Sequence, residues 1–320
     1  MNPVFLGIDT SNYTTSAAFY GDGVEINCKK LLPVKEGEVG LRQSDAVFHH
    51  TKQLPEVFEK ACDELHKLGY TMDDVAAIAV SDRPRNVDGS YMPCFLVGEL
   101  LARSLAASLN KPLYRFSHQQ GHIAAALYSA EKLELLSAPF LAYHLSGGTS
   151  EGLYVTSDAA GIPDAKLICN SLDLKAGQAI DRVGVKLGLP FPAGKYMDEL
   201  AAACGKRYKV KPSMKGASFS LSGVQNKCEK LIAEGASQEE VSAYCLEYII
   251  SSVDYSIKAL LAEYGELPVL FSGGVSSNSM LNRRMSEKYG AYFAKPAFSA
   301  DNAFGTAVLA SIKYNSEVSK

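Results

Sequence analysis

Three stretches of the chain share one pattern, in which a short apolar run leads into a small polar loop rich in glycine and serine. They cover residues 4–11, 140–150 and 268–278. After the first two, a second apolar run follows at residues 16–20 and 152–155. This pattern predicts two β-hairpins whose tips present backbone N–H groups. After the third, the pattern predicts a helix beginning near Ser279.

Between these strands, apolar residues recur at helical spacing. The pattern predicts helices over residues 47–68, 92–109, 118–136, 241–264 and 301–314, and a short strand over residues 113–116. Ser117 and Gln120 form the sequence pattern of a capping box at the start of the third helix. Strand and hairpin units that recur in two halves predict an α/β fold of two related domains around a cleft. We expect these domains to cover residues 1–112 and 113–320, and the last helix could pack back on the first.

Composition and charge narrow the class of protein. The net charge of −3 over 320 residues argues against a broad nucleic-acid surface, so any RNA would be held locally or through a partner. The seven cysteines include no Cys-x-x-Cys pair, which is typical of reduced thiols in a cytoplasmic protein. No signal-peptide pattern and no apolar run of membrane-spanning length is present. We therefore expect a cytoplasmic location and no membrane association.

Two of the six histidines lie at metal-ligand spacing. His118 and His122 are four residues apart, so on a helix they project from one face and can bind one transition metal. The alternative is two ordinary surface histidines. Gln119 stands where a His-Glu-x-x-His protease has its general base, and because Gln cannot accept a proton from water, protease chemistry is disfavoured. Asp301 is either a helix N-cap or the carboxylate that completes a two-histidine site.

The glycine-rich loops are candidates for phosphate binding. Successive N–H groups in loops such as 146–149 and 272–275 can form an anion nest, although each loop alone could be a simple tight turn. Their repetition at equivalent places, together with the loop at residues 7–11, favours a nucleotide. No Walker A or Gly-x-Gly-x-x-Gly pattern is present. Asp181 faces a Gly/Pro-rich loop and could accept hydrogen bonds from a ribose, or it could be a surface carboxylate.

Eight motifs in order span nearly the whole chain. They lie at residues 7–11, 118–122, 146–148, 176–181, 192–194, 219–223, 272–278 and 301–302. In order and spacing they resemble the TsaD family of bacterial tRNA threonylcarbamoyladenosine transferases, whose relatives were once called O-sialoglycoprotein endopeptidases. The resemblance implies an actin-like, sugar-kinase-like ATPase fold. It also implies transfer of a threonylcarbamoyl group from its adenylate to adenosine 37 of tRNAs that read codons beginning with A, with the help of accessory proteins.

The resemblance also implies a set of site residues. One divalent metal, iron or zinc, would be bound by His118, His122 and Asp301. The acyl-adenylate or another adenine nucleotide would be bound by His144, Leu145, Ser146, Gly147, Gly148, Asp181, Gly194 and Asn278. The loops that line the cleft would include Asp9, Ser11, Gly177, Gly273 and Gly274.

Several positions depart from the family pattern. Tyr13 and Thr14 stand where the family has an Asp and a Glu, and Arg83-Pro84-Arg85 replaces Gly-Pro-Gly. Thr149 and Gln225 replace a histidine and a lysine. These differences are typical of a diverged paralogue, and they leave two hypotheses. The first is an active carbamoyl transferase, which the complete His-His-Asp set favours. The second is a non-catalytic nucleotide- and metal-binding protein that regulates or scaffolds a partner, which the missing acids favour. We expect the enzyme.

Overall fold

The computed structural model describes residues 2–33 and 41–319. The chain forms two compact units, of which unit 1 comprises residues 1–138, 156–165 and 297–320 and unit 2 comprises residues 139–155 and 166–296. This division differs from the boundary expected near residue 112, because strand β5 (Leu113–Ser117) pairs in parallel with β4 (Val75–Arg83) and so belongs to the first sheet. In the described ranges, no helix combines the length and apolarity needed to cross a bilayer.

Unit 1 is built on a five-stranded mixed sheet in the order β3-β2-β1-β4-β5. Its other strands are β1 (Val4–Asp9), β2 (Thr14–Gly21) and β3 (Val24–Leu31). Its α-helices are α1 (Gln43–Lys67), α2 (Phe95–Leu109), α3 (His118–Ser129) and α10 (Phe304–Val318). Strands β1 and β2 form the first predicted hairpin, and β4 lies parallel to β1 on its other side. Every residue of β1 is buried, as expected for a central strand covered on both faces.

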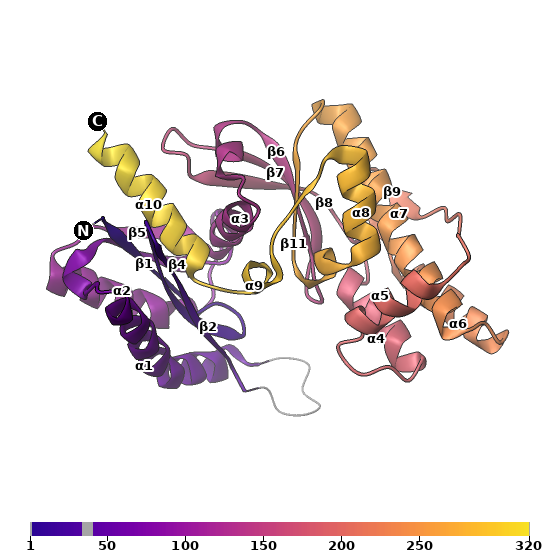
Figure 1. Ribbon diagram of the computed structural model, residues 1–320, viewed down its shortest axis with the longest axis horizontal. Coiled ribbons are helices and arrows are strands. Elements are labelled where there is room, and N and C mark those ends of the chain that lie inside the picture. The colour runs from indigo at the N-terminus through magenta and orange to yellow at the C-terminus, as the bar shows by residue number, and fades with distance from the viewer. Residues whose placement is uncertain (1, 34–40, 320) are drawn as a thin grey trace. The chain divides into compact units, whose positions relative to one another are not determined.

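Helices cover both faces of this sheet (Figure 1). Leu54 and Leu65 of α1 pack with the strands and α2 on one face, while Phe304 and Val308 of α10 pack with α3 on the other. Helices α3 and α10 approach at backbone distance, because a Cβ atom on Gly305 would overlap the carbonyl oxygen of Gly121. This contact requires a glycine at position 305, and it places the last helix on the first unit. A Cβ atom on Gly121 of α3 would in turn lie 3.0 Å from Thr306 Oγ1.

Several helix boundaries in unit 1 differ from the prediction: α1 begins at Gln43 rather than at residue 47, and α2 at Phe95 rather than at residue 92. Helix α3 ends at Ser129 rather than continuing to residue 136, because the chain turns through Glu131 in the left-handed conformation (φ 57°). A short 3₁₀ helix, Leu133–Ser137, follows. Helix α10 begins at Phe304 rather than at residue 301, with Ala303 at its N-cap. Asp301 therefore lies in the preceding loop and does not cap the helix.

Unit 2 repeats the strand order of unit 1. Its sheet is arranged β8-β7-β6-β11-β12, so that these strands correspond in turn to β3-β2-β1-β4-β5 of unit 1. Its strands are β6 (Phe140–Leu145), β7 (Ser150–Ser157), β8 (Pro163–Asn170), β9 (Ser213–Lys215), β10 (Ser218–Ser220), β11 (Val269–Ser272) and β12 (Tyr292–Phe293). Its helices are α4 (Ala176–Lys186), α5 (Gly194–Ala203), α6 (Ser222–Ala233), α7 (Gln238–Tyr264) and α8 (Ser279–Tyr289), and the short α9 (Pro296–Ser299) follows. In each sheet an antiparallel hairpin is flanked by a third strand on one side and parallel strands on the other. This confirms that the two halves are related.

Candidate ligand pocket and metal centre

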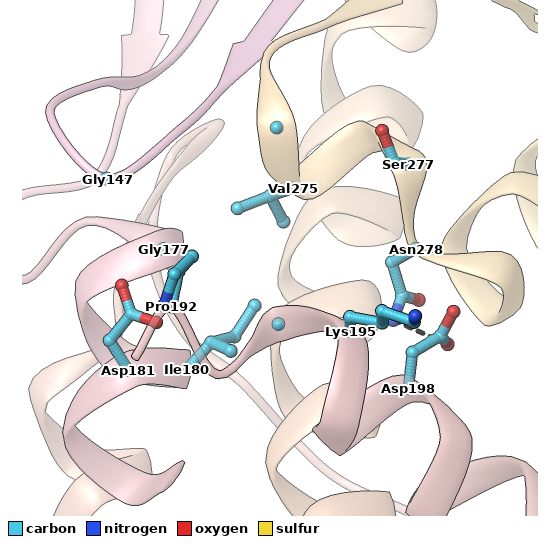
Figure 2. A pocket seen from close by; sticks show the side chains of 12 residues that line it. Gly147, Gly177, Ile180, Asp181, Pro192, Lys195, Asp198, Val275, Ser277 and Asn278 are labelled. Carbon is cyan, nitrogen blue, oxygen red and sulfur yellow. Dashed lines mark hydrogen bonds between the residues drawn. The ribbon is translucent and has the colours of Figure 1, made fainter. Parts of the chain in front are cut away.

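Unit 2 contains a pocket of about 420 Å³ where four glycine-containing segments meet (Figure 2). The tip of the β6–β7 hairpin, the start of α4, the start of α5 and the loop after β11 surround it. The lining residues are Gly147, Gly177, Ile180, Asp181, Pro192, Gly194, Lys195, Asp198, Gly274, Val275, Ser277 and Asn278. Lys195 is the only basic residue in this lining, so it is the side chain there that could neutralise an anion.

The hairpin tip lies directly on the start of α4. The backbone N–H of Gly177 donates to the carbonyl of Ser146 at 3.1 Å, and a Cβ atom on Gly177 would lie 2.6 Å from the backbone nitrogen of Gly147. Gly177 must therefore be a glycine for the two segments to touch. A Cβ atom on Gly147 or Gly194 would meet nothing within 4 Å. At these two positions the missing side chain leaves open space next to the backbone, where a ligand could approach the N–H groups.

The polar side chains of the pocket are held by the protein itself. Asp181 Oδ1 accepts a hydrogen bond from the backbone N–H of Ala193 at 2.8 Å, which ties α4 to the start of α5. Asn278 caps α8 by accepting from the N–H of Leu281, and its Nδ2 donates to Asp198 at 2.8 Å. Asp181, Asn278 and Asp198 therefore face the pocket in fixed positions (Figure 2).

The sequence found much of this pocket but not all of it. Among the predicted residues, the pocket lining includes Gly147, Gly177, Asp181, Gly194, Gly274 and Asn278. The others, His144, Leu145, Ser146, Gly148 and Gly273, lie in or next to the same loops and not in the lining. Gly273 instead packs its backbone against Leu145, with φ 89°, and His144 Nδ1 lies 3.0 Å from Ser272 Oγ. These residues shape the loops that form the wall.

The sequence analysis did not identify Lys195 and Asp198 as residues of this pocket. They lie on the first turns of α5, where nothing in their sequence neighbourhood distinguishes them from ordinary surface residues.

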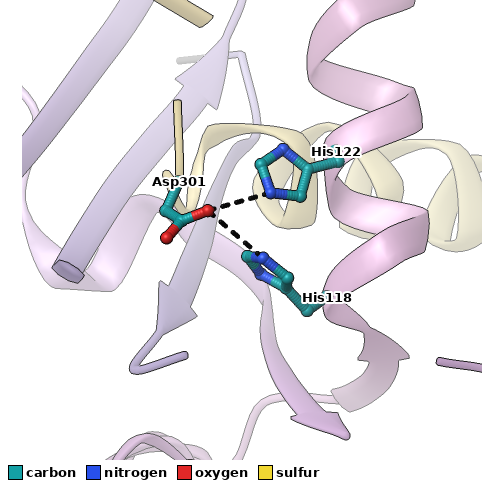
Figure 3. A group of neighbouring side chains, drawn as sticks. All are labelled: His118, His122 and Asp301. Atoms are coloured by element: carbon teal, nitrogen blue, oxygen red, sulfur yellow. Dashed lines mark hydrogen bonds and ion pairs between the residues drawn. The ribbon is translucent and has the colours of Figure 1, made fainter. Parts of the chain in front are cut away.

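Unit 1 brings the two histidines and Asp301 together. The predicted capping box at the start of α3 is present, with Gln120 Oε1 accepting from the N–H of Ser117 at 2.7 Å. The helix places the His118 and His122 rings on one face, with centroids 4.3 Å apart. Asp301 Oδ1 lies 3.1 Å from His122 Nε2 and 3.4 Å from His118 Nε2 (Figure 3). One donor atom from each residue lies within 4.8 Å of the others.

The loop that presents Asp301 is fixed by its neighbour Asn302. The amide Nδ2 of Asn302 donates to the carbonyls of Phe298 and Ala300, and its Oδ1 accepts from the N–H of Phe304 at 3.0 Å. Asn302 is buried. It therefore joins the loop to the start of α10 and holds the carboxylate of Asp301 toward the histidines.

The first loop of the chain supports His118 from behind. Asp9, fully buried at the end of β1, has Oδ2 2.9 Å from His118 Nδ1, and Ser11 Oγ lies 2.8 Å from the same nitrogen. Ser11 also donates to Asp9. With Nδ1 occupied, Nε2 is the nitrogen that faces Asp301, which is how a carboxylate fixes the tautomer of a metal-binding histidine. Sequence reasoning placed Asp9 and Ser11 in a glycine-containing loop, but it did not pair them with His118.

Opposite charges dominate this group. Burial alone would lower the pKa of His118, but the carboxylates of Asp9 and Asp301 outweigh it and raise that pKa to about 10. Burial alone would raise the pKa of Asp301, but its bonds to the two histidines hold it well below the ordinary range. Two imidazole nitrogens and one carboxylate oxygen suit a divalent transition metal such as iron or zinc, so the donor set fits the implied group. Such an ion would displace the proton on His118.

Comparison with known proteins identifies the family. The sequence model of TsaD, described as tRNA N6-adenosine threonylcarbamoyltransferase, matches residues 36–308. The chain belongs to the TsaD family. A tRNA N6-adenosine threonylcarbamoyltransferase of Brachyspira hyodysenteriae is 31% identical, over 95% of this chain and 90% of that protein. Another, from Neorickettsia sennetsu, is 27% identical over 89% of this chain and 84% of that protein.

A solved structure extends the comparison to the fold. Component A of the (R)-2-hydroxyglutaryl-CoA dehydratase of Acidaminococcus fermentans superposes with a TM-score of 0.55 at 17% identity, covering 98% of this chain and 99% of that chain. At this identity the likeness concerns the fold alone. Together with the repeated sheet topology, it confirms the actin-like, sugar-kinase-like ATPase fold that the motifs predicted.

Proposed function

We propose that this chain is a tRNA N6-adenosine threonylcarbamoyltransferase, which moves a threonylcarbamoyl group from its adenylate to N6 of adenosine 37 in tRNA. Membership of the TsaD family over residues 36–308 is the observation that supports it most directly. The convergence of His118, His122 and Asp301 adds to it, because residues far apart in sequence form one donor set. The second candidate, a protein without catalysis, becomes an outcome of the experiment below.

The proposed reaction is an acyl transfer with AMP as the leaving group. The N6 nitrogen of the tRNA adenine attacks the carbamoyl carbon, and a C–N bond forms. The bond from that carbon to the phosphate oxygen breaks, AMP leaves with the electron pair, and N6 gives up one proton. The unit 2 pocket would hold the adenylate, with its phosphate near the open backbone at Gly147 and its ribose and base near Asp181 and Asn278.

We assign one divalent metal, iron or zinc, to His118, His122 and Asp301. When bound, it supplies a Lewis acid that polarises a carbonyl oxygen. Asp9 and Ser11 keep His118 in the binding tautomer. Tyr13, which is 42% exposed, and Thr14, which is buried, replace the two acids of the family loop. Since a positioned acid or base contributes about 10²- to 10⁴-fold, we expect slower transfer than in a relative that keeps both acids.

The proposed reaction also implies an acceptor, partner proteins and a cellular location. tRNA is the proposed acceptor, and the accessory proteins of the threonylcarbamoylation system are proposed partners. A cytoplasmic location is proposed because tRNA modification occurs there and all seven cysteines are free thiols in the structure.

The test is a reconstituted assay that contains purified tRNA, threonylcarbamoyl-adenylate and the host's accessory proteins. Modified adenosine is measured by mass spectrometry and bound metal by elemental analysis. Wild type should hold one metal per chain and form product. His122→Ala should lose both, while His66→Ala, at an exposed position on α1, should keep both. No product from wild type that still binds metal and AMP would favour the non-catalytic protein.

A further inference from the structure

One long stretch of unit 2 has only positive charges. Between Glu199 and Glu229 the chain has no acidic residue and six basic ones, Lys206, Arg207, Lys209, Lys211, Lys215 and Lys227. These 29 residues contribute +6 to a chain whose total is −3, so the rest of the chain has a net charge of −9. Near-neutral overall charge therefore conceals a strong local asymmetry. Five of the six basic residues lie in the basic segment, residues 206–215.

The basic segment is anchored in a way that directs its lysines outward. Val210 and Met214 pack against the apolar core of unit 2, while Lys209, Lys211 and Lys215 are exposed. This alternation gives the lysines a common outward side, and in β9 it agrees with the two-residue period of a strand. The segment ends in the β9–β10 hairpin, where Ser213 pairs with Ser220 and donates its N–H to the Tyr248 hydroxyl at 3.2 Å. The charges therefore stand on a fixed support.

Most of these charges have no ion-pair partner among the residues that the structure describes. Lys206 is ion-paired with Glu240. In the described ranges, no carboxylate lies within ion-pair distance of Lys209, Lys211 or Lys215. Surface lysines in this number usually alternate with acids that neutralise them. Here three neighbouring ammonium groups repel one another, so an external anion would stabilise them.

We propose that the basic segment binds the phosphate backbone of the RNA acceptor. This inference rests on the proposed function, which supplies the RNA. Lysines are point charges that suit phosphates. Tyr208, the aromatic residue within the segment, packs edge-on against Tyr244, with ring centroids 5.5 Å apart, so its ring is engaged by the protein. The contact is therefore electrostatic and independent of base sequence, and it positions the tRNA without reading it. The negative charge of the remaining chain directs RNA toward this segment.

The experiment compares two triple variants with equal loss of charge. In the first, Lys209, Lys211 and Lys215 are replaced by Gln. In the control, Lys52, Lys60 and Lys166, which are exposed and lie outside the segment, are replaced by Gln. Binding of a fluorescein-labelled tRNA transcript is followed by anisotropy between about 50 and 200 mM salt. AMP binding is measured by calorimetry and product formation in the reconstituted assay.

We expect the first variant to bind tRNA about tenfold or more weakly at 0.1 M salt, and its slope of log affinity against log salt to fall in magnitude by about 2 to 3. The affinity of this variant for a tRNA without the target adenosine should fall by the same factor, and AMP binding should stay unchanged. The control should bind tRNA like wild type.

Equal loss of tRNA affinity in both variants, or loss in neither, would overturn the proposal. If wild type binds tRNA through this segment yet forms no product, the proposed function fails and the surface stands. If product forms normally with the first variant at limiting tRNA, the surface fails and the function stands. Binding of anionic vesicles and not tRNA would also overturn it.

Discussion

At the scale of the residue, His118 depends on different partners at its two ring nitrogens. Asp9 and Ser11 occupy Nδ1, and Asp301 faces Nε2. Both carboxylates lie far from His118 in sequence, and the sequence identified Asp301 only as one of two alternatives. The pairing with Asp9 could not be predicted, because it requires β1 to end beside the start of α3. Local spacing revealed the two histidines, and only tertiary structure reveals what holds them.

The first prediction concerns Asp9. Replacing it with Asn removes the charge behind His118 and allows the amide to bind Nδ1 in either orientation, so the tautomer is no longer fixed. Loss of such a supporting carboxylate typically weakens metal binding about 10- to 100-fold. Competition against a chromophoric chelator measures this. Asp73→Asn, at an exposed position, should bind metal like wild type, and an unchanged affinity in Asp9→Asn would contradict the assigned role.

The second prediction concerns His50, which is buried in α1 with Nδ1 2.8 Å from Thr15 Oγ1. Burial lowers its pKa from 6.5 to about 4, although the charge of Asp9 acts in the opposite direction. The unfolded chain takes up this proton near pH 6.5 and the folded chain only near 4, so acid favours unfolding in this window. His50 therefore contributes stability above pH 6.5 that is lost as the pH falls toward 4.

The measurement is urea unfolding at pH 7 and pH 5. The free energy of unfolding of wild type should drop between these values by about 2 kcal/mol more than that of His50→Asn, which has no proton to gain. His66→Asn, at an exposed position, should show the wild-type drop. The same pH dependence in wild type and His50→Asn would show that another group is responsible.

At the scale of the element, the strands that lead into the glycine-rich loops and two of the helix starts were the most predictable parts. The strands at residues 4–9, 140–145 and 269–272, the helix start at Ser279 and the capping box at Ser117 all agree with the pattern. Local signals encode these features. The end of α3 and the start of α10 were wrong, because the apolar spacing continued beyond the points where the backbone turns. Helix α5, which supplies Lys195 and Asp198 to the pocket, was not predicted, since its first turn lacks a capping side chain.

The third prediction separates two glycines in neighbouring elements. Gly147→Val adds a side chain to open space in the pocket wall, so it should abolish AMP binding and leave the melting temperature near that of wild type. Gly177→Val forces α4 away from the hairpin tip, because its Cβ would collide with the Gly147 backbone. It should lose both binding and stability. Calorimetry and thermal unfolding measure the two effects, and normal AMP affinity in Gly147→Val would place the ligand elsewhere.

At the scale of the whole molecule, two units with one strand order explain why the fold class could be inferred from repeated motifs. The domain boundary was harder to infer, because unit 1 is made of three separate segments of the chain. Hydrophobic periodicity reports on elements and not on which elements share a sheet. β5, α3 and α10 belong with the first unit for reasons of pairing and packing that no local pattern encodes.

The last prediction concerns activity in the cell. Expressed in a host that lacks its own family member, with the host's accessory proteins present, this chain should restore some modified adenosine in tRNA. Tyr13→Asp/Thr14→Glu should raise the yield, because an acid positioned in the first loop can assist proton transfer. Because Thr14 is buried, Tyr13→Asp alone serves as a second variant that avoids a new buried charge. Mass spectrometry of digested tRNA is the measurement, and no gain in either variant would show that these acids are dispensable here.

The discontinuity of unit 1 has a consequence for how the protein is made. His118 and His122 leave the ribosome long before Asp301, which is 179 residues further along than His122. At about 5 to 20 residues per second, translation of that interval takes about 10 to 40 seconds. During this time β1 to β5 lack the cover of α10, and the two histidines lack the carboxylate of Asp301. Loading with the proposed metal would therefore belong to the finished chain, and a prematurely terminated product would carry the histidines without the carboxylate.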